Sequence, residues 1–315
     1  MASLDDLPLR DDLRGKKAYG APMVPVRYAL NVNENTHPVP DSVRSAILES
    51  LGHALENINR YPDREFTVLR ESLATYASES HQGEAITPDM VWAANGSNEV
   101  LQHVLQAFGG PGRSLLGFPP TYSMHPIIAE STGTTWIPGR RNEDFTLSTE
   151  SVVADIETHH PDLVFFCAPN NPTGTPVSVD TIAAAYDATS GVVLVDEAYV
   201  EFLPEGTLTA SQLLPGRERL VVSRTMSKAF AFAGARVGYL LADPAVIDAM
   251  RLVRLPYHLS ALTQAAAVAA LAHRSTMLTM VADIRAQRDR LLAELPKLGY
   301  PVAYSEANFV LFSGV

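Results

Sequence analysis

One lysine stands apart from the other basic residues of this 315-residue chain. Only four of the 24 basic residues are lysines, and Lys228 is the only lysine between residues 18 and 296. An arginine keeps its proton, whereas a lysine amine can lose its proton and act as a nucleophile or a base. Lys228 is therefore the first candidate for covalent chemistry with a carbonyl group, although a solvated loop lysine is the ordinary alternative.

Further polar side chains follow apolar runs of the sequence, at the points where predicted strands end. Asp196 closes one such run, Tyr199 comes three residues later, and Asn171 follows another run. Arg236 lies downstream of Lys228. Ligands of open α/β sheets bind beyond the carboxyl ends of the strands, so these side chains are expected to share one site. The remaining candidates at such positions are Gly96, Ser97, Asn98, Tyr122, Thr225 and Ser227.

Short apolar runs alternate with amphipathic segments over residues 85–255, which predicts a large α/β domain. Several runs are apolar on both faces, as strands of a mostly parallel sheet between helices are. Helices are expected to begin after N-caps at Asp41 and Ser178. The expected strands are 91–94, 114–118, 134–137, 163–168, 192–196, 220–223 and 237–241. The expected helices of this part are 41–56, 98–108, 179–188 and 244–255.

The two ends of the chain differ from this α/β part. Residues 1–40 are rich in proline and glycine and are expected to form an arm, followed by a large ligand-binding domain over 41–256. Residues 257–315 are expected to be helical at first and to end in a strand-like run over 307–312. A smaller α+β domain built from both termini is therefore predicted, with its C-terminal part incomplete.

Composition excludes several classes of partner. The net charge of −11 argues against nucleic acid and anionic membranes. The single cysteine, Cys167, rules out an intramolecular disulfide, and the nine histidines show no metal-ligand spacing. Residues 1–10 do not resemble a secretory signal, and the nearly uncharged stretch 259–272 is too short to span a bilayer. A cytoplasmic protein is therefore expected.

The candidate residues together match the needs of one cofactor, pyridoxal phosphate. Its aldehyde needs an amine such as Lys228, its pyridinium nitrogen needs a carboxylate such as Asp196, and its phosphate needs hydrogen-bond donors. The stretch Asn95–Glu99 leads into a predicted helix, whose first N–H groups can bind an anion. Read singly, these features have ordinary alternatives, namely a capped helix, a turn at Pro169–Gly174 or a packed tyrosine. Their ordered combination favours a pyridoxal phosphate site.

The chain resembles pyridoxal-phosphate-dependent aminotransferases of fold type I, the aspartate aminotransferase fold. It is most similar to the histidinol-phosphate aminotransferase family. Thr36 departs from the pattern, because the family usually has a proline at this position. The stretches that carry the resemblance cover nearly the whole chain: Leu30–Asn35, Arg60–Asp63, Ala94–Glu99, Pro169–Gly174, Asp196–Tyr199, Ser223–Arg236, Leu255–Tyr257 and Ala307–Phe309.

The resemblance implies a role for each candidate residue. Lys228 would hold the cofactor and move the proton of the substrate Cα, while Asp196 would pair with the pyridinium N–H. Asn171 and Tyr199 would donate hydrogen bonds to the ring O3′, and Tyr122 would stack on the ring. The implied phosphate ligands are Gly96, Ser97, Asn98, Thr225, Ser227 and Arg236.

The resemblance also implies a homodimer with shared active sites, in which Tyr61 reaches the cofactor phosphate of the neighbouring subunit. The implied reaction moves an amino group between L-histidinol phosphate and 2-oxoglutarate in L-histidine biosynthesis, with imidazole acetol phosphate and glutamate as the other partners. Tyr19 and Tyr257 are the candidate substrate contacts, although packed interface tyrosines are the ordinary alternative at both positions.

Other functions stay open at this point. An aromatic amino acid aminotransferase or a phospho-amino-acid decarboxylase of the same fold would share every cofactor residue, and a non-catalytic regulator could also bind pyridoxal phosphate. A nicotinamide enzyme is disfavoured, because no Gly-x-Gly-x-x-Gly motif opens the first helix. Members of the resembled family continue past the strand-like run near Val315, into a stretch whose arginines hold the substrate phosphate and the acceptor carboxylate. We therefore interpret the sequence as a shortened form.

Overall fold

The computed structural model describes residues 3–20, 22, 25–79 and 85–314. Its contacts divide the chain into two units, Met1–Asn33 and Glu34–Val315. The first unit contains short 3-10 turns at Leu4–Asp6 and Asp11–Leu13. The second unit contains the sheet and the helices described below.

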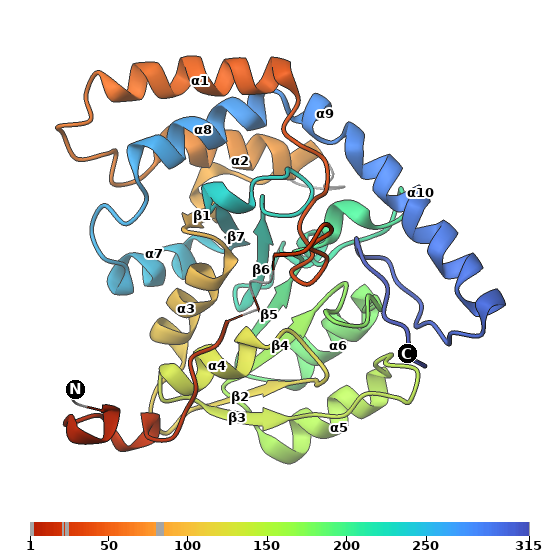
Figure 1. Cartoon of the computed structure of the whole chain (residues 1–315). Coiled ribbons are helices and arrows are strands. Elements are labelled where there is room, and N and C mark those ends of the chain that lie inside the picture. Colours follow the sequence, from red (N-terminus) through yellow and green to blue (C-terminus); the bar gives the residue numbers. More distant parts are fainter. Residues whose placement is uncertain (1–2, 21, 23–24, 80–84, 315) are drawn as a thin grey trace. The chain divides into compact units, whose positions relative to one another are not determined.

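A seven-stranded sheet forms the centre of the described part of the second unit (Figure 1). Its strand order is β1-β7-β6-β5-β4-β2-β3. Strands β2 to β6 run parallel wherever they pair, whereas β7 is antiparallel to both β1 and β6. The predicted α/β class with a mostly parallel sheet is therefore confirmed. The strands are β1 Val91–Ala94, β2 Ser114–Gly117, β3 Thr135–Pro138, β4 Leu163–Cys167, β5 Val192–Asp196, β6 Leu220–Thr225 and β7 Gly238–Ala242.

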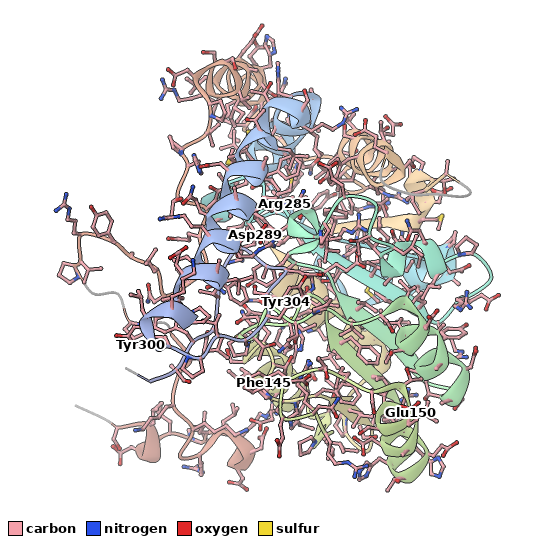
Figure 2. The ribbon with its side chains drawn as sticks, turned by 90° about the vertical axis from the view of Figure 1, so that its right-hand side faces the viewer. Phe145, Glu150, Arg285, Asp289, Tyr300 and Tyr304 are labelled. Carbon is pink, nitrogen blue, oxygen red and sulfur yellow. The ribbon has the colours of Figure 1, made fainter. Side chains whose placement is uncertain are left out.

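Helices pack around this sheet and on one another. Helix α3 contacts β1, β6 and β7, α6 contacts β5, and α1 lies along α8 (Figure 1). Figure 2 shows Arg285 and Asp289 on α10 and Tyr304 on the segment that follows this helix. The helices are α1 Asp41–Leu55, α2 Thr67–Glu79, α3 Ser97–Phe108, α4 Met124–Ser131, α5 Thr149–His159, α6 Val179–Ala188, α7 Pro244–Val253, α8 Ala261–Ala272, α9 Arg274–Met277 and α10 Thr279–Glu294.

The core lies on both faces of the inner strands. Every residue of β4, β5 and β6 is buried, including the apolar runs Leu163–Cys167 and Val192–Asp196. Full burial of one valine, leucine or phenylalanine side chain stabilises the fold by about 1.5–3 kcal/mol. Exposing either face of these strands to water would therefore lower the free energy of unfolding. Their apolar character on both faces is thus the direct result of helices covering the sheet twice.

Two local predictions need correction. Pro40 is the N-cap of α1 and Asp41 is its first helical residue, whereas Ser178 does cap α6 by accepting a hydrogen bond from the Thr181 N–H. The strand expected over 307–312 is wrong, because this segment forms only an isolated bridge between Val302 and Phe312.

Side chains explain why residues 307–312 do not form a regular strand. Ser305 Oγ donates to the carbonyl oxygen of Phe309, and Arg288 Nη1 donates to that of Ala307. These carbonyl groups are therefore satisfied locally and need no neighbouring strand.

Within the described residues, no single helix is long and apolar enough to cross a membrane. One pair, Ala261–Ala272 with Arg274–Leu298, passes the length and composition test only when taken together, and it is bent by 83°.

Candidate active site

Most of the sequence-predicted cofactor residues lie at one edge of the sheet. Asp196 is the last residue of β5 and pairs in register with Ser223 of β6. Gly238 of β7 pairs with Ala94 on one side and with Thr225 on the other. The turn after β1 and the loop after β6 therefore lie next to each other at the ends of these strands. This is the edge at which open α/β sheets bind ligands.

Asp196 is a buried carboxylate with two polar neighbours. Its Oδ2 lies 3.3 Å from Nε2 of His125, and its Oδ1 accepts a hydrogen bond from Ser223 Oγ at 3.3 Å. Both Asp196 and His125 are almost completely buried. Both contacts are long, which leaves the carboxylate able to accept a further, charged donor.

Asn171, Tyr199 and Lys228 form a second group at this edge. Asn171 Nδ2 donates a hydrogen bond to the Tyr199 hydroxyl at 3.2 Å. Lys228 Nζ lies 5.9 Å from the centroid of the Tyr199 ring. An amide donor, a phenol and an amine from three separate loops are thus brought together.

The surroundings of Lys228 favour its neutral amine. Burial lowers the pKa of Lys228 below its usual range, and the nearby Arg236 guanidinium lowers it further. The carboxylates of Glu34 and Asp196 act in the opposite direction and limit this shift. A lysine with a lowered pKa is a better nucleophile and base near neutral pH.

The turn after β1 forms a cradle that depends on two glycines. Gly96 has a φ of +86° and is the N-cap of α3, which begins at Ser97. A Cβ atom on Gly96 would lie 2.3 Å from Nη2 of Arg236, and a Cβ atom on Gly238 would lie 2.2 Å from the Ser97 nitrogen. Arg236 also donates to the carbonyl oxygen of Asn95 at 3.4 Å. An arginine beside the N-terminus of a helix is a suitable place for a phosphate group.

Two buried hydroxyls complete this cradle. Thr225 Oγ1 accepts a hydrogen bond from the Ser227 N–H at 3.1 Å and donates one to Ser227 Oγ at 3.0 Å. The same Thr225 hydroxyl lies 3.2 Å from the carbonyl oxygen of Val237. The loop after β6 therefore presents hydroxyl groups close to the turn after β1.

The aromatic candidates divide into three cases. Tyr122 is half-buried, and its hydroxyl donates to Asn98 Oδ1 at 3.2 Å, which places it beside the cradle. Tyr61 and Tyr257 stack on each other, with their ring centroids 4.5 Å apart, and Tyr61 is 80% exposed. Tyr19 belongs to the first unit, so its role as a substrate contact stays a prediction.

Sequence reasoning missed His125 and Ser223, which hold the Asp196 side chain. His125 lies three residues after Tyr122, near the start of α4, a helix that the sequence analysis did not predict. Its separation from Asp196 by 71 residues hides their contact from any local pattern. The Ser223 hydroxyl does stand near a predicted strand end, so its position was the one available signal.

The described residues fit pyridoxal phosphate as a bound group. The glycine-dependent cradle offers N–H groups, hydroxyls and the Arg236 guanidinium to a phosphate. The buried Asp196 carboxylate can accept the pyridinium N–H. Lys228 supplies the amine, and the hydrogen-bonded pair of Asn171 and Tyr199 supplies polar groups for the ring oxygen. Each part of the cofactor therefore finds a chemically matching group.

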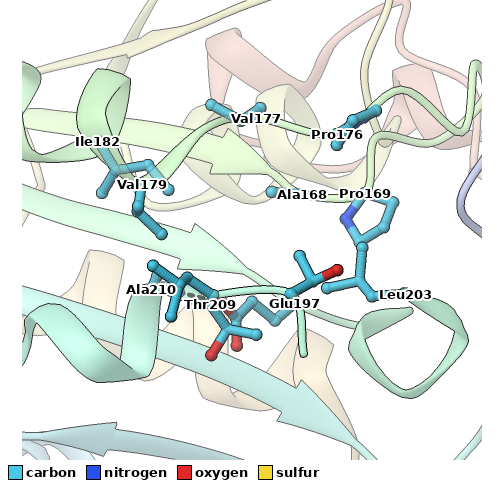
Figure 3. Close-up of a pocket in the computed structure, with 12 residues that line it drawn as sticks. Ala168, Pro169, Pro176, Val177, Val179, Ile182, Glu197, Leu203, Thr209 and Ala210 are labelled. Atoms are coloured by element: carbon cyan, nitrogen blue, oxygen red, sulfur yellow. Dashed lines mark hydrogen bonds between the residues drawn. The ribbon is translucent and has the colours of Figure 1, made fainter. Parts of the chain in front are cut away.

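Two cavities of the described structure lie away from the candidate site residues. One, of about 30 Å³, is lined by Pro169, Ile182 and Glu197 among others and has room for little more than water (Figure 3). A second, of about 190 Å³, lies between α10 and the segments 36–37 and 308–310. No candidate site residue lines either cavity, so neither changes the location of the candidate site.

The sequence profile of the class I and II aminotransferases matches residues 28–315. The chain therefore belongs to the class I and II aminotransferase family.

Its relatives within this family include histidinol-phosphate aminotransferases. The one from Paenarthrobacter aurescens is 56% identical over 315 residues, which cover 99% of this chain and 83% of that relative. The one from Thermobifida fusca is 53% identical over 310 residues, which cover 98% of this chain and 83% of that relative. The family resemblance that the sequence motifs indicated is confirmed.

Solved structures place the fold in the same group. Aspartate aminotransferase from Thermus thermophilus with maleate has a TM-score of 0.77 and 25% identity, covering 89% of this chain and 75% of that one. Histidinol-phosphate aminotransferase from Sinorhizobium meliloti, in complex with pyridoxal-5′-phosphate, has a TM-score of 0.78 and 23% identity. The match covers 89% of this chain and 73% of that one. The predicted aspartate aminotransferase-like fold of type I is therefore confirmed.

Proposed function

We propose that this chain is a pyridoxal-phosphate-dependent aminotransferase that moves the amino group between L-histidinol phosphate and 2-oxoglutarate in L-histidine biosynthesis. The observation that carries the proposal is the position of Lys228, a half-buried amine at the strand edge where β5 ends in the buried carboxylate of Asp196. The substrate is supported by the relatives, which are histidinol-phosphate aminotransferases at 56% and 53% identity.

When bound, pyridoxal phosphate supplies an aldehyde that joins to amines and a ring that takes up electrons as the substrate Cα loses its proton. Lys228 would attach to the aldehyde and, once displaced by the substrate amine, would take the Cα proton on Nζ. The lowered pKa of Lys228 suits both tasks, since each needs the neutral amine. A positioned base of this kind contributes on the order of 10²–10⁴ to the rate.

The other residues of the site would bind and orient the cofactor. Asp196, held by His125 and Ser223, would keep the pyridinium nitrogen protonated, and Asn171 and Tyr199 would donate to the ring oxygen. Tyr122 would cover one face of the ring. The phosphate would be held by Gly96, Ser97, Asn98, Thr225, Ser227 and Arg236, where charge-assisted hydrogen bonds contribute about 1.5–3 kcal/mol each.

A half-reaction tests the aminotransferase assignment. The cofactor-loaded protein is mixed with L-histidinol phosphate without 2-oxoglutarate, and its yellow absorbance is followed. We expect the colour to be bleached, then restored by 2-oxoglutarate with release of one glutamate per site. A colour that borohydride can fix to Lys228 but that L-histidinol phosphate never bleaches would contradict this function and favour a non-catalytic regulator.

Two further measurements distinguish the enzymes of the same fold. We expect kcat/KM for L-histidinol phosphate to exceed that for phenylalanine, and we expect no carbon dioxide release from phenylalanine, the substrate of the two that carries a carboxyl group. A preference for phenylalanine would assign the chain to the aromatic aminotransferases. Stoichiometric carbon dioxide release from a carboxylated substrate would assign it to the decarboxylases.

We also propose that the enzyme is a homodimer with shared sites and that it works in the cytoplasm. The proposal of a dimer is supported by exposed apolar side chains close in sequence to Tyr257, which stacks on Tyr61: Leu252 is 86% and Leu255 is 76% exposed. Isolated monomers rarely expose several large apolar groups together. A second copy of the chain would cover them and could receive Tyr61.

Complementation tests the sharing of sites. Lys228→Ala removes the amine of a protomer's own site, and Tyr61→Ala removes the group proposed to enter the partner's site. When both inactive variants are unfolded and refolded together, a mixed dimer should contain one intact site and recover activity. Recovery should be absent when either variant is refolded alone, and a monomeric mass in light scattering would contradict the dimer.

A further inference from the structure

Asn35 connects a strap formed by residues 34–37 to the backbone that carries the candidate lysine. Its Nδ2 donates a hydrogen bond to the carbonyl oxygen of Lys228 at 3.1 Å and lies 3.4 Å from that of Ala229. Its Oδ1 accepts a hydrogen bond from the His37 N–H at 2.9 Å. The amide group therefore bonds the lysine loop on one side and its own strap on the other.

The loop that Asn35 contacts has an unusual backbone. Ala231 has a φ of +51° and Arg236 has a φ of +57°, in the region that side-chain-bearing residues rarely adopt. The Ala231 N–H donates to the Lys228 carbonyl oxygen at 3.2 Å, so this oxygen accepts bonds from both the loop and Asn35. Backbone of this kind persists only where its surroundings hold it in place.

The strap is itself attached to a helix far along the chain. Asn35 Nδ2 lies 2.8 Å from Sδ of Met280, which is buried in α10. His37 Nε2 lies 3.2 Å from Asp283 Oδ2, also in α10, the helix on which Figure 2 labels Arg285 and Asp289. The strap therefore contacts both the lysine loop and α10, so that α10 as well as strand β6 helps to hold the lysine loop in place.

We propose that Asn35 is a positioning residue, which keeps the Nζ atom of Lys228 at its place in the site by holding the Lys228–Ala229 backbone. The proposal rests on the proposed catalytic role of Lys228. Asn35 does not itself take part in the chemistry, because its amide is occupied by carbonyl oxygens and a backbone N–H.

The pKa of Lys228 reports its position. Burial and Arg236 lower the pKa of this amine, while Glu34 and Asp196 raise it, so displacement of the side chain into water should bring the pKa back toward its usual value. Competitive acetylation of the cofactor-free protein with acetic anhydride over a series of pH values, quantified by peptide mass spectrometry, measures this pKa directly. Lys297, exposed and paired with Glu294, serves as an internal reference.

Asn35→Ala and Asn35→Asp are the two variants to compare with the wild type. Alanine removes the whole amide, and aspartate keeps Oδ1 for His37 but places an oxygen against the two carbonyl oxygens. We expect the pKa of Lys228 to rise toward its usual value in Asn35→Ala, and hydrogen exchange over residues 226–232 to become faster in both variants, with no change at Lys297. His37→Ala is the matched control, because it removes the contact with Asp283 but keeps the backbone N–H whose hydrogen bond Asn35 Oδ1 accepts, and we expect a smaller change in it than in the Asn35 variants.

Three outcomes would overturn the proposal. Folded Asn35 variants with a wild-type Lys228 profile and wild-type exchange would do so, as would an equal change in His37→Ala. Loss of folding in both Asn35 variants would assign the residue to folding instead of lysine positioning. If wild-type Lys228 itself labels with the same pH dependence as Lys297, the proposed role of Lys228 fails, and that result is distinct from a failure of the Asn35 proposal alone.

Discussion

Two consecutive residues at the end of β5 hold their carboxylates in different ways. Asp196 lies on the side of the candidate site. Its carboxylate oxygens lie 3.3 Å from Nε2 of His125 and 3.3 Å from Oγ of Ser223. Glu197, next in sequence, accepts hydrogen bonds from the Ala210 N–H at 2.7 Å and from Arg224 at 2.9 Å and 2.8 Å. Both carboxylates are buried.

The difference suggests different roles for the two carboxylates: Asp196 can bind a ligand, whereas Glu197 stabilises the fold. Successive side chains of a strand point to opposite faces of the sheet, so Ser223 and Arg224 of β6 follow the same division. The tight pair of Glu197 and Arg224 ties the segment at Thr209 and Ser211 to the sheet, since Arg224 Nη2 also donates to Ser211 Oγ at 3.2 Å. The looser contacts of Asp196 leave it free to bind a cationic group.

The largest effect should come from the site side. We expect Lys228→Ala to lower the rate of the half-reaction by more than about 10⁴-fold, because it removes both the attachment point and the base. Single-turnover absorbance with L-histidinol phosphate measures this loss. Lys297→Ala, at an exposed lysine, is the control and should react like the wild type. A Lys228→Ala protein within tenfold of the wild type would refute the assignment.

Asp196→Asn tests the looser carboxylate. Removing one partner of a buried charge pair costs about 3–5 kcal/mol, so pyridoxal phosphate should bind about 10²- to 4 × 10³-fold more weakly and turnover should fall with it. Equilibrium dialysis gives the affinity, and urea unfolding of the cofactor-free protein checks the fold. We expect that unfolding free energy to change little. Wild-type affinity in this variant would remove Asp196 from the site.

Glu197→Gln should show the reverse pattern. The change leaves Arg224 as an unpaired buried cation, which should lower the free energy of unfolding by about 3–5 kcal/mol. Activity per folded molecule should stay near that of the wild type, because Glu197 faces away from the site. Urea unfolding monitored by circular dichroism provides the measurement. Stability equal to the wild type, or lost cofactor binding in the folded variant, would contradict the division between the two carboxylates.

A smaller, pH-dependent effect is expected at Glu201, which lies near this network. Burial raises the pKa of Glu201 to about 7 from an ordinary 4.5, and Tyr76 donates a hydrogen bond to its Oε1 at 3.0 Å. The folded protein thus holds this proton more tightly than the unfolded chain does. Its stabilising contribution, up to about 3 kcal/mol, is complete below pH 4.5 and is lost as the pH rises to about 7.

Glu201→Gln isolates this contribution. The variant cannot ionise at this position, so its free energy of unfolding should decrease less than that of the wild type between pH 4.5 and 7. Urea titrations at several pH values in this window give the comparison. Parallel curves for the two proteins would show that Glu201 does not titrate in the folded state.

Much of the fold could be predicted from the sequence, for a local reason. Runs such as 192–195 are apolar on both faces, and such a short pattern favours a strand inside a covered sheet. Helices α2, α4 and α5 were not predicted, and the strand expected over 307–312 was wrong because side chains satisfy that backbone instead. The resemblance that the motifs indicated was confirmed by the family match.

The sequence by itself determined which residues can do chemistry, because residue type and place at a strand end are local properties. Lys228, Asp196 and Asn171 were proposed as site residues in this way. Only the tertiary structure decided which residues contact them. His125 is hydrogen-bonded to Asp196, and Tyr199 accepts a hydrogen bond from Asn171. Asn35 donates one to the backbone carbonyl oxygen of Lys228. Asn35 and Lys228 are 193 positions apart in the chain. Contacts over such separations depend on how helices and loops pack on the sheet, and no local pattern of residues records that packing.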